Sequence, residues 1–193
     1  MIGLAYIAAF VVYLIIFIAV VWLAARAARK RNIKRWKWGV PAALFMYLVV
    51  FWDHIPSLLL HDYYCESEAG FWIYTSPEQW VQKNPGVAET LVETEDVQSE
   101  NGAYILNQRF RWSVKKTGPH PVALFRHEQT VFDVVTGEVM ARYVDFSRGY
   151  GNPFTYNPYG WSGLKFWLGK NHCKGGRKNQ GKMGNLILTY KQI

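Results

Sequence analysis

The chain has few cysteines and distributes its charge unevenly. Only two of its 193 residues are cysteine, which excludes a disulfide-dense scaffold and a four-cysteine zinc module. Half of the residues are hydrophobic and 17% are aromatic, so a disordered or low-complexity protein is excluded as well. The net charge of +8 is compatible with an anionic partner.

The charges divide the chain into segments of different character. Residues 1–25 carry no charge, and residues 26–37 carry seven Lys or Arg and no acid. Residues 62–100 carry nine acids against one lysine, whereas residues 101–193 carry fourteen Lys or Arg against four acids. The acidic and basic parts either pair with each other or mark two partner surfaces.

The first apolar run is long enough to span a membrane. Residues 4–25 are 22 uncharged residues, and a spanning helix needs about 20. A signal peptide is the alternative, but its basic residues precede the apolar run, whereas here they follow it. We therefore predict a spanning helix.

A second crossing is expected from residues 38–52 together with residues 55–60. Either segment is too short alone, because a helix rises about 1.5 Å per residue. Pro41 is tolerated in the first turns, whereas Pro56 is expected to kink the helix or end it near Asp53. The alternative is one span followed by a re-entrant or interfacial segment.

The basic stretch between the two runs predicts the orientation. By the positive-inside rule, residues 26–37 form a cytoplasmic loop, and everything after residue 62 lies outside the cytoplasm. We predict a multi-pass protein of a bacterial inner membrane, with a transmembrane hairpin at 1–61 and a periplasmic domain at 62–193.

The predicted fold class is an α+β membrane protein whose outer domain is mainly antiparallel β with short helices. Thr136-Gly137 indicates a hairpin turn. Residues 147–181 are expected to be mostly loop, with a short helix or strand at 164–168, and residues 93–100 a solvated loop or strand edge. The expected strands are 71–74, 103–115, 122–135, 138–146 and 186–190, and the expected helices are 77–83 and 85–91.

The two thiols, Cys65 and Cys173, are predicted to pair, because both fall in the part of the chain placed in an oxidising compartment. The alternatives are two free buried thiols, or a metal site that includes His172 or His61. No ligand pair has zinc spacing, so no metal is predicted.

Several basic residues near the C-terminus are candidates for contact with an anion, a lipid head group or a partner. Residues 176–183 nearly match a phosphate loop, but Met183 stands where a hydroxyl is needed. We therefore expect a flexible loop, no nucleotide and no nucleic acid. The candidates are Lys174, Arg177, Lys178, Lys182 and Trp161.

Polar residues at the outer end of the second apolar run form another candidate site. Asp53 and His54 are predicted to make a polar contact in or near the membrane, and Tyr13 reaches a similar depth and could bond Asp53. The alternative is that Pro56 ends the helix early, which leaves Asp53 in water.

The sequence contains no recognisable hydrolase or cofactor motif, so no catalytic residue, cofactor or metal is assigned. We expect a membrane-anchored accessory subunit that contacts lipid and recognises an envelope protein or a second copy of itself, in an assembly, secretion, pilus, transport or exclusion system. The alternative is an enzyme that acts on a lipid or cell-wall substrate, with Asp53, His54, His61 and Asp62 at the membrane surface.

Overall fold

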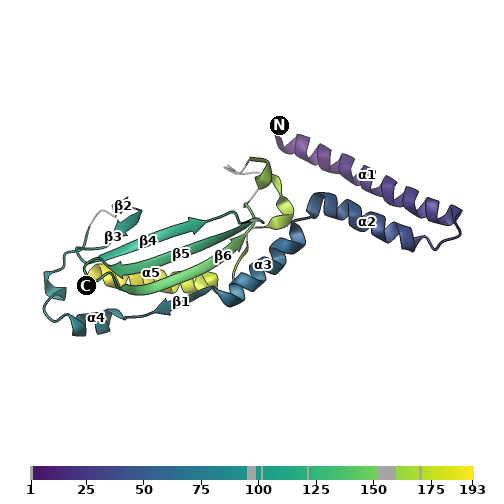
Figure 1. Ribbon diagram of the computed structural model, residues 1–193. Helices are drawn as coiled ribbons and strands as arrows, with labels where there is room; N and C mark the ends of the chain where they lie inside the picture. Colours follow the sequence, from purple (N-terminus) through teal and green to yellow (C-terminus); the bar gives the residue numbers. More distant parts are fainter. Residues whose placement is uncertain (1, 95–98, 101, 121, 152–159, 170) are drawn as a thin grey trace.

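The protein combines a helical N-terminal part with an antiparallel sheet, and its fold is α+β (Figure 1). The computed structural model describes residues 2–94, 99–100, 102–120, 122–151, 160–169 and 171–193. The α-helices are α1 (Ile2–Lys30), α2 (Trp36–Phe51), α3 (His54–Ser67), α4 (Pro77–Lys83) and α5 (Gly176–Gln192). The 3₁₀ helices are η1 (Ala88–Thr90), η2 (Gly160–Leu164) and η3 (Phe166–Leu168).

Helix α1 confirms the predicted apolar helix. Its part from Ile7 to Lys30 is long and apolar enough to cross a membrane, and none of the most apolar window is buried inside the protein. An apolar surface exposed on all sides suits a lipid environment better than water. Helix α2 packs along α1 (Figure 1), and the Tyr13 hydroxyl donates a 2.6 Å hydrogen bond to the Met46 carbonyl.

The helix breaks at Trp52 and Asp53, near the position that Pro56 predicts, and α2 and α3 meet at an angle of 65°. Pro56 has no N–H to bond the carbonyl of Trp52, so the helical hydrogen bonds are interrupted there. They resume where the amide of Ser57 donates to the Asp53 carbonyl at 3.0 Å. Helices α2 and α3 have the length of a span only as one bent pair, so a second crossing stays a prediction.

The sheet has seven strands in the order β1-β6-β5-β4-β3-β2, and β7 also pairs with β6. The hairpin predicted at Thr136-Gly137 joins β5 to β6, and Gly137 has the positive φ of 73° that such turns require. The strands are β1 (Gly70–Ile73), β2 (Ser99–Glu100), β3 (Ala103–Ile105), β4 (Phe110–Thr117), β5 (Leu124–Asp133), β6 (Val139–Arg148) and β7 (Asn171–His172).

The strand predicted at 186–190 is wrong, because this segment lies in α5. Met183, Ile187 and Tyr190 are buried, and their spacing of four and three residues is that of one helix face. They pack on Phe110 and the other core residues on one face of the sheet. The apolar residues 186–188 resemble a strand only when they are considered without the preceding turn. The flexible loop expected at 176–183 is wrong for the same reason.

The single strand predicted over 103–115 is also wrong, because it is divided into β3 and β4 by a turn. Asn107 makes this turn: its side-chain oxygen accepts the amides of Arg109 and Phe110, both at 2.9 Å. Its side-chain amide donates to the carbonyl of Tyr190 at 2.9 Å. Asparagine favours turns because its side chain bonds nearby backbone in this way.

The shorter elements agree in part with the expectations. Helix α4 begins as predicted, with Ser76 and Gln79 forming a reciprocal capping box. The second expected helix, 85–91, is reduced to the single turn η1. The segment 93–100, expected to be a solvated loop or a strand edge, contains β2, and its residues 95–98 lie outside the described part of the chain.

Candidate functional site

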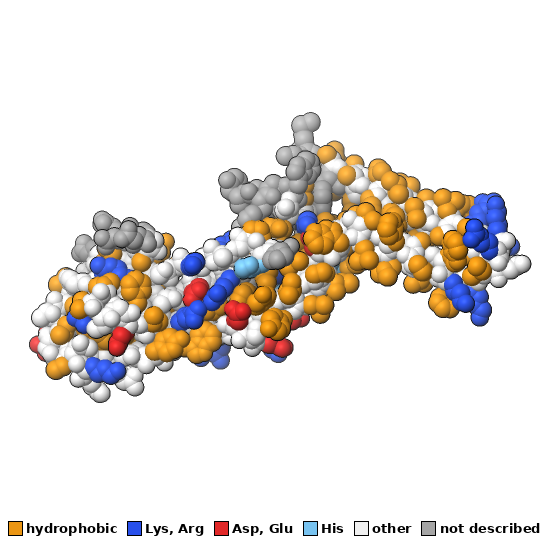
Figure 2. Space-filling view, viewed as in Figure 1, with side chains coloured by type: hydrophobic (Ala, Val, Ile, Leu, Met, Phe, Trp, Pro, Cys, Tyr) orange, Lys and Arg blue, Asp and Glu red, His pale blue; other side chains and the backbone are white. Residues whose placement is uncertain are grey.

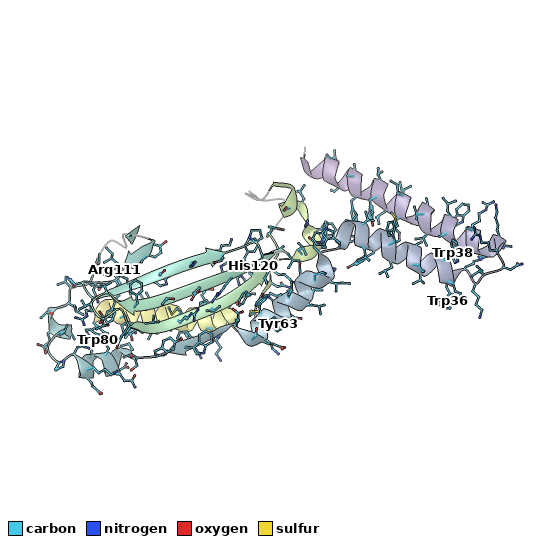
Figure 3. The ribbon with its side chains drawn as sticks, viewed as in Figure 1. Trp36, Trp38, Tyr63, Trp80, Arg111 and His120 are labelled. Carbon is cyan, nitrogen blue, oxygen red and sulfur yellow. A yellow bond between two sulfur atoms is a disulfide. The ribbon has the colours of Figure 1, made fainter. Side chains whose placement is uncertain are left out.

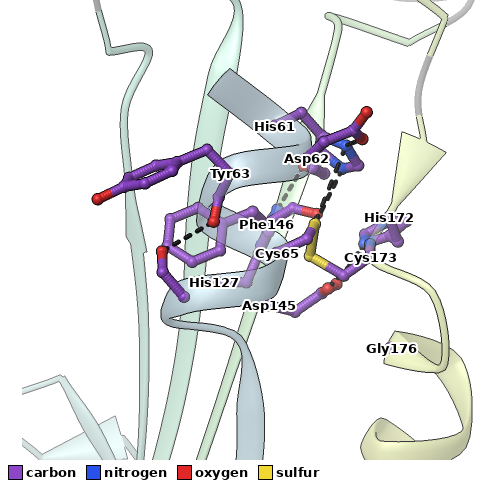
Figure 4. The surroundings of a disulfide bond; sticks show 12 residues. His61, Asp62, Tyr63, Cys65, His127, Asp145, Phe146, His172, Cys173 and Gly176 are labelled. Atoms are coloured by element: carbon purple, nitrogen blue, oxygen red, sulfur yellow. Dashed lines mark hydrogen bonds and ion pairs between the residues drawn. A yellow bond between two sulfur atoms is a disulfide. The ribbon is translucent and has the colours of Figure 1, made fainter. Parts of the chain in front are cut away.

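The two cysteines form a disulfide that joins α3 to the segment before α5 (Figure 4). Their Cα atoms are 5.4 Å apart, and 108 residues separate them in the sequence. This confirms the predicted pairing and excludes two free thiols. The bond closes a large loop that contains all seven described strands of the sheet.

His61 lies beside the disulfide because it precedes Cys65 by one turn of α3. Its Nε2 is 3.5 Å from the Cys65 sulfur, and the side chain is buried. The imidazole and the two sulfurs lie within 4.8 Å of one another. Since the sulfurs are bonded to each other, the three groups have the donor set of a metal site only if the disulfide is reduced.

A second set of polar side chains lies near the disulfide, on the side of β6. Asp145, 3% exposed, lies with its Oδ2 2.6 Å from His172 Nδ1, and its Oδ1 accepts the amide of Cys173 at 3.2 Å. His127 Nε2 is 2.8 Å from the hydroxyl oxygen of Ser147. Three of the five histidines therefore surround the disulfide (Figure 4).

A cleft of about 670 Å³ opens between α3 and the start of α5. Four of the residues that line it are basic, and the only acid among them is Asp62, whose side chain is 73% exposed. The basic residues are Arg148, Lys174, Arg177 and Lys178; Leu58, His61, Asn171, His172, Cys173 and Gly175 complete the lining.

The first turn of α5 has an unusual electrostatic composition. It carries Arg177 and Lys178 and no acid, and its N-cap Gly175 makes no side-chain cap. The N-terminus of a helix favours anions and disfavours cations. The Asp145 carboxylate lies close to this helix end and accepts the amide of Cys173, and an anionic group in the cleft would compensate the two cations.

The structure brings together three of the predicted contact residues, Lys174, Arg177 and Lys178, in this cleft. Lys182 is exposed one turn further along α5 and does not line the cleft. Trp161 belongs to η2, but its side chain lies outside the described residues. Sequence reasoning did not include Arg148 in this group, because only the antiparallel pairing of β6 with β7 places it opposite Asn171 of the cleft lining.

Asp53 and His54 do not join the cleft, because both bond elsewhere. Asp53 is 2% exposed and accepts hydrogen bonds from Lys165 Nζ at 2.5 Å and Trp167 Nε1 at 3.0 Å. His54 Nδ1 lies 2.7 Å from the Tyr47 hydroxyl. Tyr13 bonds the Met46 carbonyl rather than Asp53. A contact of these residues with a partner in the membrane stays a prediction.

The site therefore consists of a disulfide with three histidines around it and an adjoining cation-lined cleft. The cleft's composition is suited to binding a carboxylate or phosphate group. Comparison of the chain with family models, curated proteins and solved structures finds no match.

Proposed function

We propose that the protein is a membrane-anchored accessory subunit whose sheet region recognises an acidic segment of another envelope protein. The observation that carries the proposal is the cleft, in which Arg148, Lys174, Arg177 and Lys178 face a single exposed acid. Charged surfaces of one sign select partners of the other sign and accelerate their encounter.

The proposed placement is a bacterial inner membrane with the sheet region in the periplasm. In this placement α1, which is long and apolar enough to cross a membrane, would be one span, and the bent pair of α2 and α3 would be the second. The basic turn between α1 and α2 supports a cytoplasmic position for that turn. The disulfide between Cys65 and Cys173 supports an oxidising compartment for the sheet region.

An enzyme at the outer membrane face is the second candidate. It needs at least two of Asp53, His54, His61 and Asp62 in one pocket, and His61 and Asp62 meet this condition, because both line the cleft with His61 Nδ1 3.4 Å from Asp62 Oδ1. A second observation in its favour is His172, which is bonded to Asp145 and partly exposed in the cleft. A carboxylate that orients an imidazole in this way occurs in general-base catalysis.

The test is site-specific photo-crosslinking of the full chain in cells. A photoreactive residue at Lys174 is expected to crosslink one partner, and R177E/K178E is expected to weaken that crosslink by about tenfold. The control K115E/K182E changes the charge equally on exposed residues that do not line the cleft.

The mass of the crosslinked species distinguishes a second copy of this chain from a different protein. An unchanged crosslink in R177E/K178E, or an equal loss in both double variants, would contradict recognition through the cleft.

A further inference from the structure

The proposed function assigns no ligand to residues 26–37, which form the end of α1, the connection to α2 and the start of α2. This segment, named here the basic turn, borders a hollow. The hollow has a volume of about 530 Å³. Three arginines and one lysine line it, together with one tryptophan and one alanine. These residues are Trp22, Ala25, Arg26, Arg29, Lys30 and Arg35.

The cations of this turn have no acidic partner in the helical pair. The first acid of the sequence is Asp53, which lies at the opposite end of α2 and is bonded to Lys165 and Trp167. The seven Lys and Arg of residues 26–37 are all exposed. Figure 2 shows them as a group of blue side chains at the end of an orange helical pair. Their neutralising charge therefore comes from outside this part of the chain.

Two of the guanidinium groups make cation–π contacts with tryptophan rings. Arg26 lies 5.1 Å from the ring centroid of Trp22, and Arg31 lies 5.2 Å from that of Trp38. Trp36 and Trp38 lie at the same end of α2 (Figure 3). Tryptophan is enriched at the level of lipid head groups, so the hollow lies where the apolar surface of α1 gives way to charge.

We propose that this hollow binds the head group of an anionic phospholipid. The proposal rests on the membrane placement given under Proposed function. Guanidinium groups bind phosphate oxygens through paired, charge-assisted hydrogen bonds, and basic pockets between membrane helices bind anionic head groups. Trp22 and Ala25 supply the apolar wall against which the first carbons of the acyl chains pack.

The test measures lipid binding by the purified full chain in detergent, by native mass spectrometry, with phosphatidylglycerol and phosphatidylcholine as probes. The variant R26Q/R29Q/R35Q removes three cations that line the hollow. The control R31Q/K34Q/K37Q removes three cations of the same turn that do not line it. We expect the first variant to bind phosphatidylglycerol about 100-fold more weakly and the control to bind it nearly as the parent does.

Three results would overturn the proposal. Equal losses in both variants would show diffuse attraction to the basic turn, and equal binding of phosphatidylcholine would show that the net negative charge of the head group is not recognised. Displacement of the lipid by millimolar inorganic phosphate would assign the site to a soluble anion.

Alkaline extraction of membranes separates this proposal from the proposed function. If the chain is extracted into the soluble fraction, the membrane placement and the lipid site are both wrong. If the chain stays in the membrane and the Lys174 crosslink persists while phosphatidylglycerol does not bind, only the lipid site is wrong.

Discussion

Asp133 is a buried carboxylate with several polar partners at the end of the sheet away from α1 and α2. It is fully buried, and both of its oxygens accept a bond from Arg109 Nε at 2.8 Å. Trp80 Nε1 and the backbone amide of Val135 also donate to it. Burial alone would raise the pKa of Asp133, but these donors more than offset it, so the pKa is lowered. The carboxylate thus joins α4, the turn before β4 and the hairpin after β5.

We expect Asp133 to make the stability of the sheet region depend on acidic pH. A lowered folded-state pKa contributes stability above the unfolded value, about 3.9, and this contribution is lost as pH falls through the folded pKa. D133N is expected to lower the free energy of unfolding by about 3–5 kcal/mol at pH 7, because it leaves Arg109 unpaired.

Denaturant unfolding of the full chain in detergent at pH 7 and at pH 3, followed by tryptophan fluorescence, checks this. The difference in stability between parent and variant should shrink at the lower pH. A difference of the same size at both pH values would show that ionised Asp133 does not supply the stability.

Among the elements, sequence patterns predicted those with a local signal and failed where long-range packing decides. Ser76 and Thr136-Gly137 mark a helix start and a turn by their own chemistry, and both are confirmed. The turn at Asn107 and the helix around Ile187 are joined by the hydrogen bond from the Asn107 side chain to the Tyr190 carbonyl. The two segments lie far apart in the sequence, so a local sequence pattern around one contains no information about the other. Both were therefore predicted as strands.

In the candidate site, too, sequence patterns identified only the residues that are close together in the chain. Lys174, Arg177 and Lys178 are neighbours in the sequence and were predicted together, whereas His61, Asp62 and Arg148 reach the cleft only through folding. The pairing of the two cysteines was predictable because the chain has no other thiol.

The disulfide between α3 and the start of α5 is expected to stabilise the sheet region strongly. In the chain-entropy model, a closed loop of about 100 residues contributes about 4.7 kcal/mol. C65S is therefore expected to lower the free energy of unfolding by several kcal/mol and to abolish the mobility shift between reducing and non-reducing electrophoresis.

The double variant C65S/C173S is the control. It should be no less stable than C65S, because the disulfide is already absent from the single variant. Alkylation of two thiols in the native parent protein would contradict the disulfide.

At the scale of the whole molecule, polar, aromatic and covalent contacts tie the helical part to the sheet region. Asp53 at the bend bonds Lys165 and Trp167, Tyr64 of α3 stacks on Phe146 of β6, and the disulfide adds a covalent link. The helical part and the sheet region extend in different directions from this junction (Figure 1). The cleft lies at the junction, so a partner bound there is also next to the proposed membrane surface.

The proposed orientation predicts the behaviour of reporter fusions. Alkaline phosphatase fused after Ile193 is expected to be active, because it folds only outside the cytoplasm, and a fluorescent protein sensitive to export is expected to be dark there. Fusions after Asn32, in the basic turn, should give the opposite pair of results. A cytoplasmic signal from the fusion after Ile193 would reverse the proposed topology.

The sheet order has a consequence for biosynthesis. Among the residues that the structure describes, strand β1 pairs only with β6, so it leaves the ribosome long before this partner exists. Until then Phe71, Trp72 and Ile73 are unshielded in a nascent chain, where exposed apolar strands aggregate. On the proposed membrane placement, the neighbouring helices would be inserted by then and would keep this segment at the bilayer surface, apart from other copies, until synthesis has passed residue 148.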